Sequence, residues 1–243
     1  MAIMVIIGAT SDIARAAAVA IGRQGWDLHL AGRDAATLQK NAADIALRTG
    51  RDVTWSHFDA ADLSSHKSFW ESVAGKAEGV LCAVGMLGDQ PKAEHDQALA
   101  QVILQTNFTG LVPVLSMAAN TFEERGEGLI IGLSSVAGDR GRGSNYLYGS
   151  AKAGFTAFLS GLRNRLAAKG VHVITVKPGF VATSMTDGLN LPPQLTATSE
   201  QVAADIVAAV NKKRNIVYTL WFWRWIMWII KHIPEGIFKK LKL

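Results

Sequence analysis

Tyr148 and Lys152 are the residues whose types and spacing best suit chemistry. Because they are four residues apart, they would share one face of a helix, about one turn from each other. A nearby ammonium favours the phenolate and lowers the pKa of a tyrosine, so this hydroxyl could exchange a proton with a carbonyl or alcohol near neutral pH. Ser135 follows an apolar run and could hold the same oxygen by a hydrogen bond. Tyr-x-x-x-Lys alone is common on exposed helices, so the predicted acid–base site depends on this serine and its strand–loop–helix context.

The elements that must position these residues are predicted from an alternation of strand-like and helical stretches. Short apolar runs recur near 3–8, 28–31, 52–58, 79–84, 129–133, 171–177 and 215–219. Helical stretches lie between them, near 12–23, 35–48, 65–76, 94–123, 145–168 and 199–211. This alternation is typical of βαβ units. Right-handed crossovers then favour a doubly wound Rossmann-type α/β fold with about seven parallel strands and helices on both faces.

The chain carries no internal repeat or low-complexity linker, so we expect one domain over 1–215 and an apolar, basic helical tail over 216–243. The longest irregular stretch, 184–199, has the length typical of a lid. The N-terminus lacks the basic segment and cleavage site of a signal peptide, which predicts a cytoplasmic location. The single cysteine, Cys82, excludes a disulfide framework and a multi-cysteine metal site, and we expect no metal.

The charge balance argues against a nucleic-acid partner. The chain has 25 basic and 20 acidic side chains, which give a net charge of +5. Residues 212–243 contain eight basic side chains and one acidic one, so this segment carries +7 and the body carries −2. The basicity therefore belongs to the tail, and the body has the balance of an ordinary enzyme.

A phosphate-binding turn is predicted where the first strand meets the first helix. Gly8 allows a tight turn, and backbone N–H groups at a helix N-terminus bind phosphate. Asp12 and Ala14 occupy the positions of the expected second and third glycines. A carboxylate at 12 would repel a pyrophosphate unless it turns away. The alternative function of the turn is a helix cap by Thr10, Ser11 or Asp12.

Arg33, at the end of the second strand, predicts which dinucleotide would bind. In dinucleotide folds an acid at this place bonds the ribose 2′-hydroxyl, whereas an arginine suits a 2′-phosphate. Asp34 is the alternative acid, although it is better placed to cap the next helix. We therefore expect NADP (NADPH) rather than NAD.

With these motifs in order, the chain resembles the short-chain dehydrogenase/reductase family over residues 3 to about 210. The resemblance implies a catalytic tetrad of Asn107, Ser135, Tyr148 and Lys152. It also implies a cofactor site made by Gly8, Thr10, Ser11, Asp12, Ile13, Arg33, Asp59, Ala60, Ala83, Val84, Gly85, Tyr148, Lys152, Pro178, Gly179, Val181 and Thr183. The family commonly forms dimers or tetramers, which implies a homodimer or homotetramer through the helices near 94–123 and 145–168.

The resemblance implies a role for each member of the tetrad. NADPH would give a hydride to a carbonyl carbon while Tyr148 protonates the carbonyl oxygen and Ser135 polarises it. Lys152 would bond the nicotinamide ribose and depress the tyrosine pKa, and Asn107 would help to hold a water that relays protons. Asp59 would contact the adenine.

Two further segments bear on the cofactor. Pro178-Gly-Phe-Val-Ala-Thr183 matches the family segment that holds the nicotinamide carboxamide. Cys82-Ala-Val-Gly85 replaces the family's Asn-Asn-Ala-Gly and keeps only the small second residue and the last glycine. That replacement leaves some sheet-stabilising hydrogen bonds in doubt, but not the chemistry.

The tail suggests a membrane surface. Between Ile216 and Ile230 the only charge is Arg224, and four of the seven tryptophans lie between Trp221 and Trp228. This run is shorter than the about 20 residues that a membrane span requires, whereas tryptophans beside lysines suit an interfacial helix on anionic lipid. A subunit interface and a lid over the substrate site are the alternatives.

The tail also resembles that of a reductase subfamily, the decaprenylphosphoryl-pentosulose 2-reductases, which reduce a lipid-linked keto-sugar. Arg140 and Arg142, in the loop after Ser135, could pair with a lipid phosphate, or they could simply be solvated. A small-molecule or lipid-linked ketone is therefore the expected substrate. A 3-oxoacyl thioester or another hydrophobic ketone is the alternative, and a non-catalytic NADP-binding sensor is the alternative of a different class.

Overall fold

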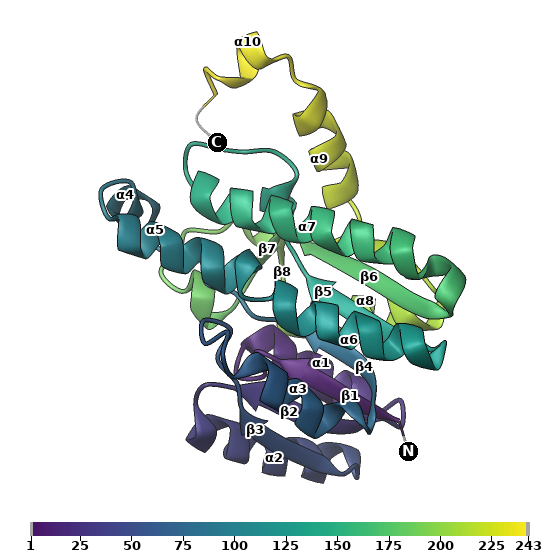
Figure 1. Ribbon diagram of the computed structural model, residues 1–243. Coiled ribbons are helices and arrows are strands. Elements are labelled where there is room, and N and C mark those ends of the chain that lie inside the picture. The colour runs from purple at the N-terminus through teal and green to yellow at the C-terminus, as the bar shows by residue number, and fades with distance from the viewer. Residues whose placement is uncertain (1, 242–243) are drawn as a thin grey trace.

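Seven apolar runs pair into one parallel sheet in the computed structural model, which describes residues 2–241. The strand order is β3-β2-β1-β4-β5-β6-β9 (Figure 1). The strands are β1 (Ile3–Ile7), β2 (Asp27–Gly32), β3 (Val53–His57), β4 (Ala77–Cys82), β5 (Gly128–Leu133), β6 (Val171–Pro178) and β9 (Ile216–Thr219). The order reverses between β1 and β4, and in open α/β sheets ligands bind outside the carboxyl ends of the strands at such a switch point. The predicted doubly wound topology is confirmed.

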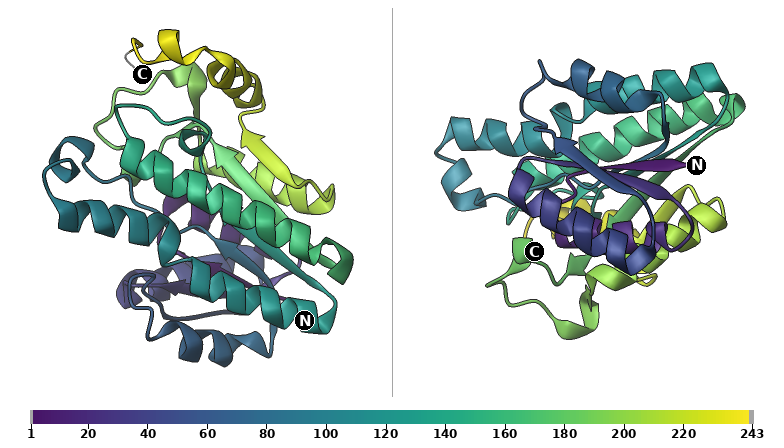
Figure 2. Two further views of the ribbon diagram at one scale, coloured as in Figure 1. Left: turned by 45° about the horizontal axis from the view of Figure 1, so that its top comes forward. Right: turned by 90° about the horizontal axis from the view of Figure 1, so that it is seen from below.

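The helices form one layer on each face of the sheet (Figure 2). The longer ones are α1 (Asp12–Gly22), α2 (Ala35–Thr49), α3 (His66–Ala74), α5 (Gln97–Leu104), α6 (Val112–Arg125), α7 (Tyr146–Leu166), α8 (Ser199–Asn211) and α9 (Trp223–His232). Side chains of α1, α2 and α8 share one hydrophobic core with the sheet, and those of α3, α6 and α7 share the other. The short helices are α4 (Gln90–Ala93) and α10 (Glu235–Phe238).

The inner strands of the sheet are buried on both faces, which explains why they are continuous apolar runs, whereas the edge strand β3 has no buried residue. Successive residues of β1 point to opposite faces. Met4 and Ile6 enter the core beneath α1, α2 and α8, whereas Val5 and Ile7 enter the core beneath α3, α6 and α7. None of these four side chains is more than 1% exposed. Parallel strands covered on both faces have this pattern.

The long helical stretch predicted over 94–123 is interrupted by one turn of π-helix. This turn, η1 (Gln105–Thr109), joins α5 to α6. Residues 97–125 are, within the described part of the chain, the one helical run long and apolar enough to cross a membrane, and 44% of its most apolar window is buried. Leu111, Val114 and Leu115 pack in the hydrophobic core, so the apolar character of the run is explained by core packing.

The sheet extends past the predicted domain boundary at 215. β9 pairs in parallel with β6, from Thr175 beside Ile216 to Pro178 beside Thr219. Residues 216–219 are therefore the edge strand of the body, and the part of the tail outside the sheet begins at Leu220. Its helix α9 rises from the sheet edge past α7, and α10 lies beyond the loop that leads into α7 (Figure 1).

The stretch predicted to be irregular over 184–199 contains only short elements. The 3₁₀ turns η4 (Ser184–Thr186) and η5 (Pro193–Leu195) lie between two short strands, β7 (Phe180–Val181) and β8 (Thr196–Ala197), which pair with each other. Thr198 then caps α8 by accepting a hydrogen bond from the Gln201 backbone N–H. The remaining 3₁₀ turns are η2 (Val136–Gly138) and η3 (Ala167–Lys169).

Candidate active site

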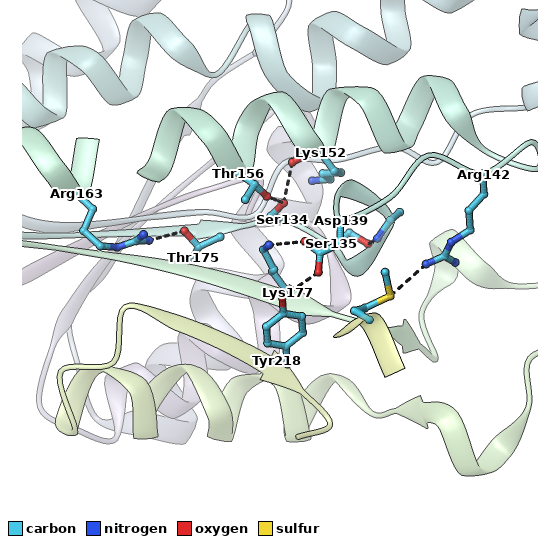
Figure 3. Close-up of polar contacts among 12 residues, drawn as sticks. Ser134, Ser135, Asp139, Arg142, Lys152, Thr156, Arg163, Thr175, Lys177 and Tyr218 are labelled. Carbon is cyan, nitrogen blue, oxygen red and sulfur yellow. Dashed lines mark hydrogen bonds and ion pairs between the residues drawn. The ribbon is translucent and has the colours of Figure 1, made fainter. Parts of the chain in front are cut away.

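Ser135, Tyr148 and Lys152 come together at the carboxyl end of β5. Ser135 follows this strand and caps η2, because its Oγ accepts a hydrogen bond from the Ala137 backbone N–H at 3.1 Å. Tyr148 lies in the first turns of α7 and hydrogen-bonds Ser135. The Lys152 Nζ lies 5.7 Å from the centre of the Tyr148 ring. The predicted triad is therefore one site, and Figure 3 shows Ser135 and Lys152 within it.

Burial controls the proton affinities of this site. It raises the pKa of Tyr148 to about 12, against the opposing effect of the hydrogen bond from Ser135. It lowers the pKa of Lys152 to about 8, because an ammonium loses its hydration inside the protein. The expectation that the lysine depresses the tyrosine pKa is therefore wrong for this structure. Desolvation outweighs the effect of the Ser135 hydrogen bond, so Tyr148 keeps its proton at neutral pH.

The Lys152 ammonium is held by the sheet. Its Nζ donates a hydrogen bond to the carbonyl oxygen of Leu133, the last residue of β5, at 3.0 Å, and the residue is 3% exposed. Ser134 ties the same helix to the same strand, since its Oγ lies 3.1 Å from the Lys152 carbonyl oxygen and 2.7 Å from Thr156 Oγ1. These bonds fix the register of α7 on β5, and they place the cation beside Tyr148.

Asn107 completes the group from the π-helical turn. It is fully buried, and its Nδ2 donates to the carbonyl oxygens of Met86 and Ile103, both at 2.8 Å. Its Oδ1 accepts from the Met86 backbone N–H at 3.1 Å. A Cβ on Gly85 would lie 3.2 Å from Asn107 Oδ1 and 3.4 Å from Lys152 Nζ, so a glycine keeps open the space between these two side chains. π-Helical turns inside α-helices are frequent at functional sites.

The predicted phosphate-binding turn packs against the end of β4. Gly8 has φ +83, and a Cβ at this position would lie 2.7 Å from the Val84 nitrogen and 2.9 Å from the Ala83 carbonyl carbon. Ser11 caps α1 by accepting a hydrogen bond from the Ala14 N–H, so one of the alternative cap assignments is confirmed. The first N–H groups of α1, at Asp12 and Ile13, have no partner within the helix by its geometry. A backbone of this shape fits a phosphate.

Asp12 is turned toward the segment after β7. Its Oδ2 accepts a hydrogen bond from the Ser184 N–H at 2.8 Å, and its Oδ1 lies 3.8 Å from Arg15. The bond from Ser184 is the main cause that lowers the pKa of Asp12, so the carboxylate is ionised. Its place in the glycine-rich turn is therefore explained by a contact 172 residues away in the chain, which sequence spacing does not reveal.

Arg33 is exposed at the end of β2, next to this turn. Asp34 accepts hydrogen bonds from the Thr37 N–H and Oγ1, so it caps α2 as predicted and is occupied. Asp59, beyond β3, accepts from the Ala61 N–H at 2.9 Å, and the neighbouring Ala60 is buried. The Arg33 guanidinium, at the end of β2, therefore fits a 2′-phosphate on the ribose of the dinucleotide better than a 2′-hydroxyl.

The segment predicted to hold the nicotinamide contacts the tail directly. The Gly179 N–H donates to the Thr219 carbonyl oxygen at 3.0 Å, which extends the β6–β9 ladder past Pro178. A Cβ on Gly179 would lie 2.0 Å from the Trp223 indole nitrogen, so only a glycine lets this tryptophan approach. Further along, Val181 is buried, and Thr183 caps η4. Sequence analysis did not identify Trp223 as part of this wall.

The two arginines predicted to contact substrate have different environments. The Arg140 guanidinium donates to the carbonyl oxygens of Ile230 and Ile233 at 2.6 and 2.7 Å. It also pairs with Glu235 at 2.9 Å. Groups of the tail therefore accept the hydrogen bonds of the Arg140 guanidinium. This finding corrects the expectation that Arg140 binds a substrate phosphate. In contrast, Arg142 contacts only Met227 Sδ at 3.5 Å among the described residues, and its Nε is buried without a hydrogen-bond partner.

A buried ion pair beside the site was not predicted. Lys177 Nζ lies 2.5 Å from Asp139 Oδ1, and the side chains are 8% and 3% exposed. Tyr218, on β9, donates to the other oxygen of Asp139 at 2.9 Å (Figure 3). Burial is the main cause that raises the pKa of Tyr218, so its hydroxyl keeps the proton that it donates. The sequence offers one signal for this ion pair, which is Lys177, a charged residue within a mostly apolar strand.

Comparison with known proteins agrees with this geometry. The family model of short chain dehydrogenases matches residues 2–193. An uncharacterised oxidoreductase of Mycobacterium tuberculosis is 35% identical over 241 residues, which are 98% of this chain and 96% of that protein. One from Streptomyces coelicolor is 34% identical over 241 residues, with 98% and 95% covered. The acetoacetyl-CoA reductase of Cupriavidus necator is 31% identical over 168 residues, with 68% and 65% covered.

Solved structures share the fold. A short-chain dehydrogenase from Sphingobium yanoikuyae in complex with NADPH has a TM-score of 0.84 at 19% identity, with 99% of this chain and 96% of that chain covered. One from Burkholderia cenocepacia in complex with NADP has a TM-score of 0.84 at 18% identity, with 100% and 98% covered. By its family model and its relatives, the chain belongs to the short-chain dehydrogenase/reductase family and is an oxidoreductase.

Proposed function

We propose that this chain is an NADP(H)-dependent carbonyl reductase that uses Tyr148 as its general acid. The observation that carries this proposal is the convergence of Ser135, Tyr148 and Lys152 at the end of β5. The bound nicotinamide supplies a hydride to the carbonyl carbon. Tyr148, protonated at neutral pH, gives its proton to the carbonyl oxygen, which Ser135 orients by a hydrogen bond. The Lys152 ammonium stabilises the phenolate that remains.

Replacing Tyr148 with phenylalanine should lower kcat for ketone reduction by about a hundredfold or more, because it removes the proton donor and leaves the ring in place. NADPH binding, measured by fluorescence titration, should change little. The matched control is Tyr146→Phe, since Tyr146 is two residues away on the same helix and is 41% exposed. Turnover by Tyr148→Phe close to that of the wild type would show that the acid lies elsewhere. Absence of NADPH oxidation by the wild type across a broad ketone panel would favour the non-catalytic sensor.

We propose NADP(H), rather than NAD(H), as the cofactor. Support comes from Arg33, which is exposed, and from Asp34, whose carboxylate caps α2 by accepting a hydrogen bond from the Thr37 N–H. It also comes from the glycine turn that packs on β4, and from structural neighbours that were solved with NADPH and NADP. The residues at this turn and at Gly85 would hold the dinucleotide across the carboxyl edge of the sheet.

Arg33→Ala should weaken NADPH binding about ten- to hundredfold and leave NADH binding nearly unchanged, because one charge-assisted bond to the 2′-phosphate is lost. The comparison needs dissociation constants for both dinucleotides. Arg48→Ala is the control, since Arg48 is also exposed but pairs with Asp44 on α2. If the wild type binds the two dinucleotides equally, this account of cofactor choice fails.

We further propose a hydrophobic ketone as the substrate, in particular a lipid-linked keto-sugar. The tail resemblance to the decaprenylphosphoryl-pentosulose 2-reductases supports this, as does Arg142, whose buried Nε has no partner in the described residues. A phosphate near Arg142 would supply one. The alternative is a 3-oxoacyl thioester, which the acetoacetyl-CoA reductase relative favours. Assaying both ketone classes with the wild type and Arg142→Met separates them, because only the phosphate-bearing ketone should depend on this arginine.

We also propose that the enzyme is cytoplasmic, that it works at the inner face of a membrane, and that it is a homodimer or homotetramer. The exposed face of the tail supports membrane contact. Trp221, Trp225 and Trp228 are 73%, 56% and 57% exposed. Exposed cations, among them Arg224 and Lys231, lie on the same helix. Aromatic rings with cations suit an anionic interface. Exposed Val102 on α5 is available to a subunit contact of the family type.

Full-length protein should co-sediment with vesicles that contain anionic lipid and not with neutral ones, and salt should weaken the binding. Trp225→Ala with Trp228→Ala should reduce the bound fraction, because both rings are exposed and absent from the hydrophobic cores. Trp55→Ala is the matched control, since Trp55 is an exposed tryptophan on the opposite edge strand, β3. If the double variant instead changes the oligomeric state and the wild type stays in the supernatant, this face is a subunit interface.

A further inference from the structure

Arg140 lies in the loop between Ser135 and α7, and its guanidinium binds the far end of the tail. Besides Ile230 and Ile233, it reaches the Lys231 carbonyl oxygen at 3.3 Å. These carbonyls belong to the last turn of α9 and the residue after it, where carbonyl groups lack partners within the helix and the helix dipole favours a cation. The Phe238 ring covers the guanidinium at 3.6 Å, and the side chain is only 14% exposed. One side chain therefore holds both the end of α9 and the start of α10.

The residues just before Arg140 hold the same loop against the body. Asp139 is bound to Lys177 on β6 and to Tyr218 on β9. Gly138 lies against α7, because a Cβ at this position would be 2.6 Å from the Lys152 carbonyl carbon. Three consecutive residues therefore contact three different parts of the molecule, namely the catalytic helix, the sheet edge and the tail.

The buried face of the tail adds a second connection to this loop. Val136, the residue after Ser135, packs in one hydrophobic cluster with Trp223 and Met227 of α9. Trp223 also donates from its indole nitrogen to the Leu195 carbonyl oxygen, at 3.2 Å, in the segment before β8. The tail thus contacts the Ser135 loop, the predicted nicotinamide segment and the segment before β8.

We propose that Arg140 is a positioning residue that clamps the tail onto the Ser135 loop, so that the tail forms part of the active site. The contacts of Arg140 and Val136 hold η2 in place on the sheet. The position of η2 in turn sets that of the Ser135 hydroxyl, because Ser135 Oγ accepts a hydrogen bond from the Ala137 N–H in η2. The guanidinium of Arg140 is engaged by the tail, at Ile230, Ile233 and Glu235. This inference rests on the proposed role of Ser135 in orienting the carbonyl oxygen only for its kinetic consequence, and its structural part is independent of the reaction.

Reciprocal hydrogen exchange on the full-length protein tests the clamp without a substrate. Arg140→Met should speed amide exchange in residues 230–238, about 90 positions away in the chain. In the opposite direction, Glu235→Gln with Phe238→Ala should speed exchange in residues 136–139. In each case, amide exchange is measured in the segment that carries no substitution. Arg165→Met is the matched control, since Arg165 also makes several bonds, to Glu123 and Asn120, away from the tail. It should change neither segment.

Kinetics then test the positioning role. Arg140→Met should lower kcat about tenfold while the NADPH dissociation constant stays within about twofold, because a displaced hydroxyl impairs reaction geometry more than cofactor binding. Arg140→Lys should recover part of the loss, since it keeps the charge but offers one nitrogen in place of a planar fork. If the altered tail leaves exchange at 136–139 unchanged, the clamp is overturned. If kcat is unchanged while the melting temperature falls, the positioning role is overturned. If no ketone is reduced by the wild type, the proposed function fails, and the exchange result still decides the clamp.

Discussion

A lysine ammonium buried at the carboxyl end of β5 is the constraint on which the rest of the site depends. A buried cation is costly unless it is hydrogen-bonded, and Lys152 is bonded to the Leu133 carbonyl oxygen. That bond requires α7 to lie in one register on β5, which also places Tyr148 at the mouth of the site. The approach of Asn107 from the π-helical turn, with Gly85 between, follows from the same need to leave room around the ammonium.

Desolvation, rather than the attraction between lysine and tyrosine, dominates the proton affinities. It keeps Tyr148 protonated and makes Lys152 a weaker base than an ordinary lysine. A tyrosine of this kind is ready to give a proton to a carbonyl oxygen, so the site suits reduction at neutral pH. The ion pair of Asp139 with Lys177 ties the Ser135 loop to β6, and the hydrogen bond from Tyr218 ties the same loop to the edge strand β9.

The elements that the sequence predicts well are those with a local signal. The five strands from β2 to β6 in the sheet order, β2, β1, β4, β5 and β6, follow from apolar runs because most of their residues are buried, and the caps at Ser11 and Asp34 follow from short-range side-chain chemistry. Features that depend on distant partners were missed or mistaken. Asp12 meets Ser184 only in the folded chain, and Arg140 meets the end of α9. The strand-like run predicted near 215–219 is the edge strand β9, which follows the predicted boundary at 215 directly and belongs to the sheet.

The pH dependence of ketone reduction tests the acid–base account most directly. If the Lys152 ammonium supports proton transfer from Tyr148, kcat should be level at lower pH and should fall as pH rises through about 8, where this buried lysine loses its proton. The folded-state pKa is lowered, so the fall comes well before an ordinary lysine, with a pKa of about 10.4, would titrate. A rate that stays level up to pH 10 would contradict the account, because it would mean that catalysis does not depend on a desolvated ammonium beside the tyrosine.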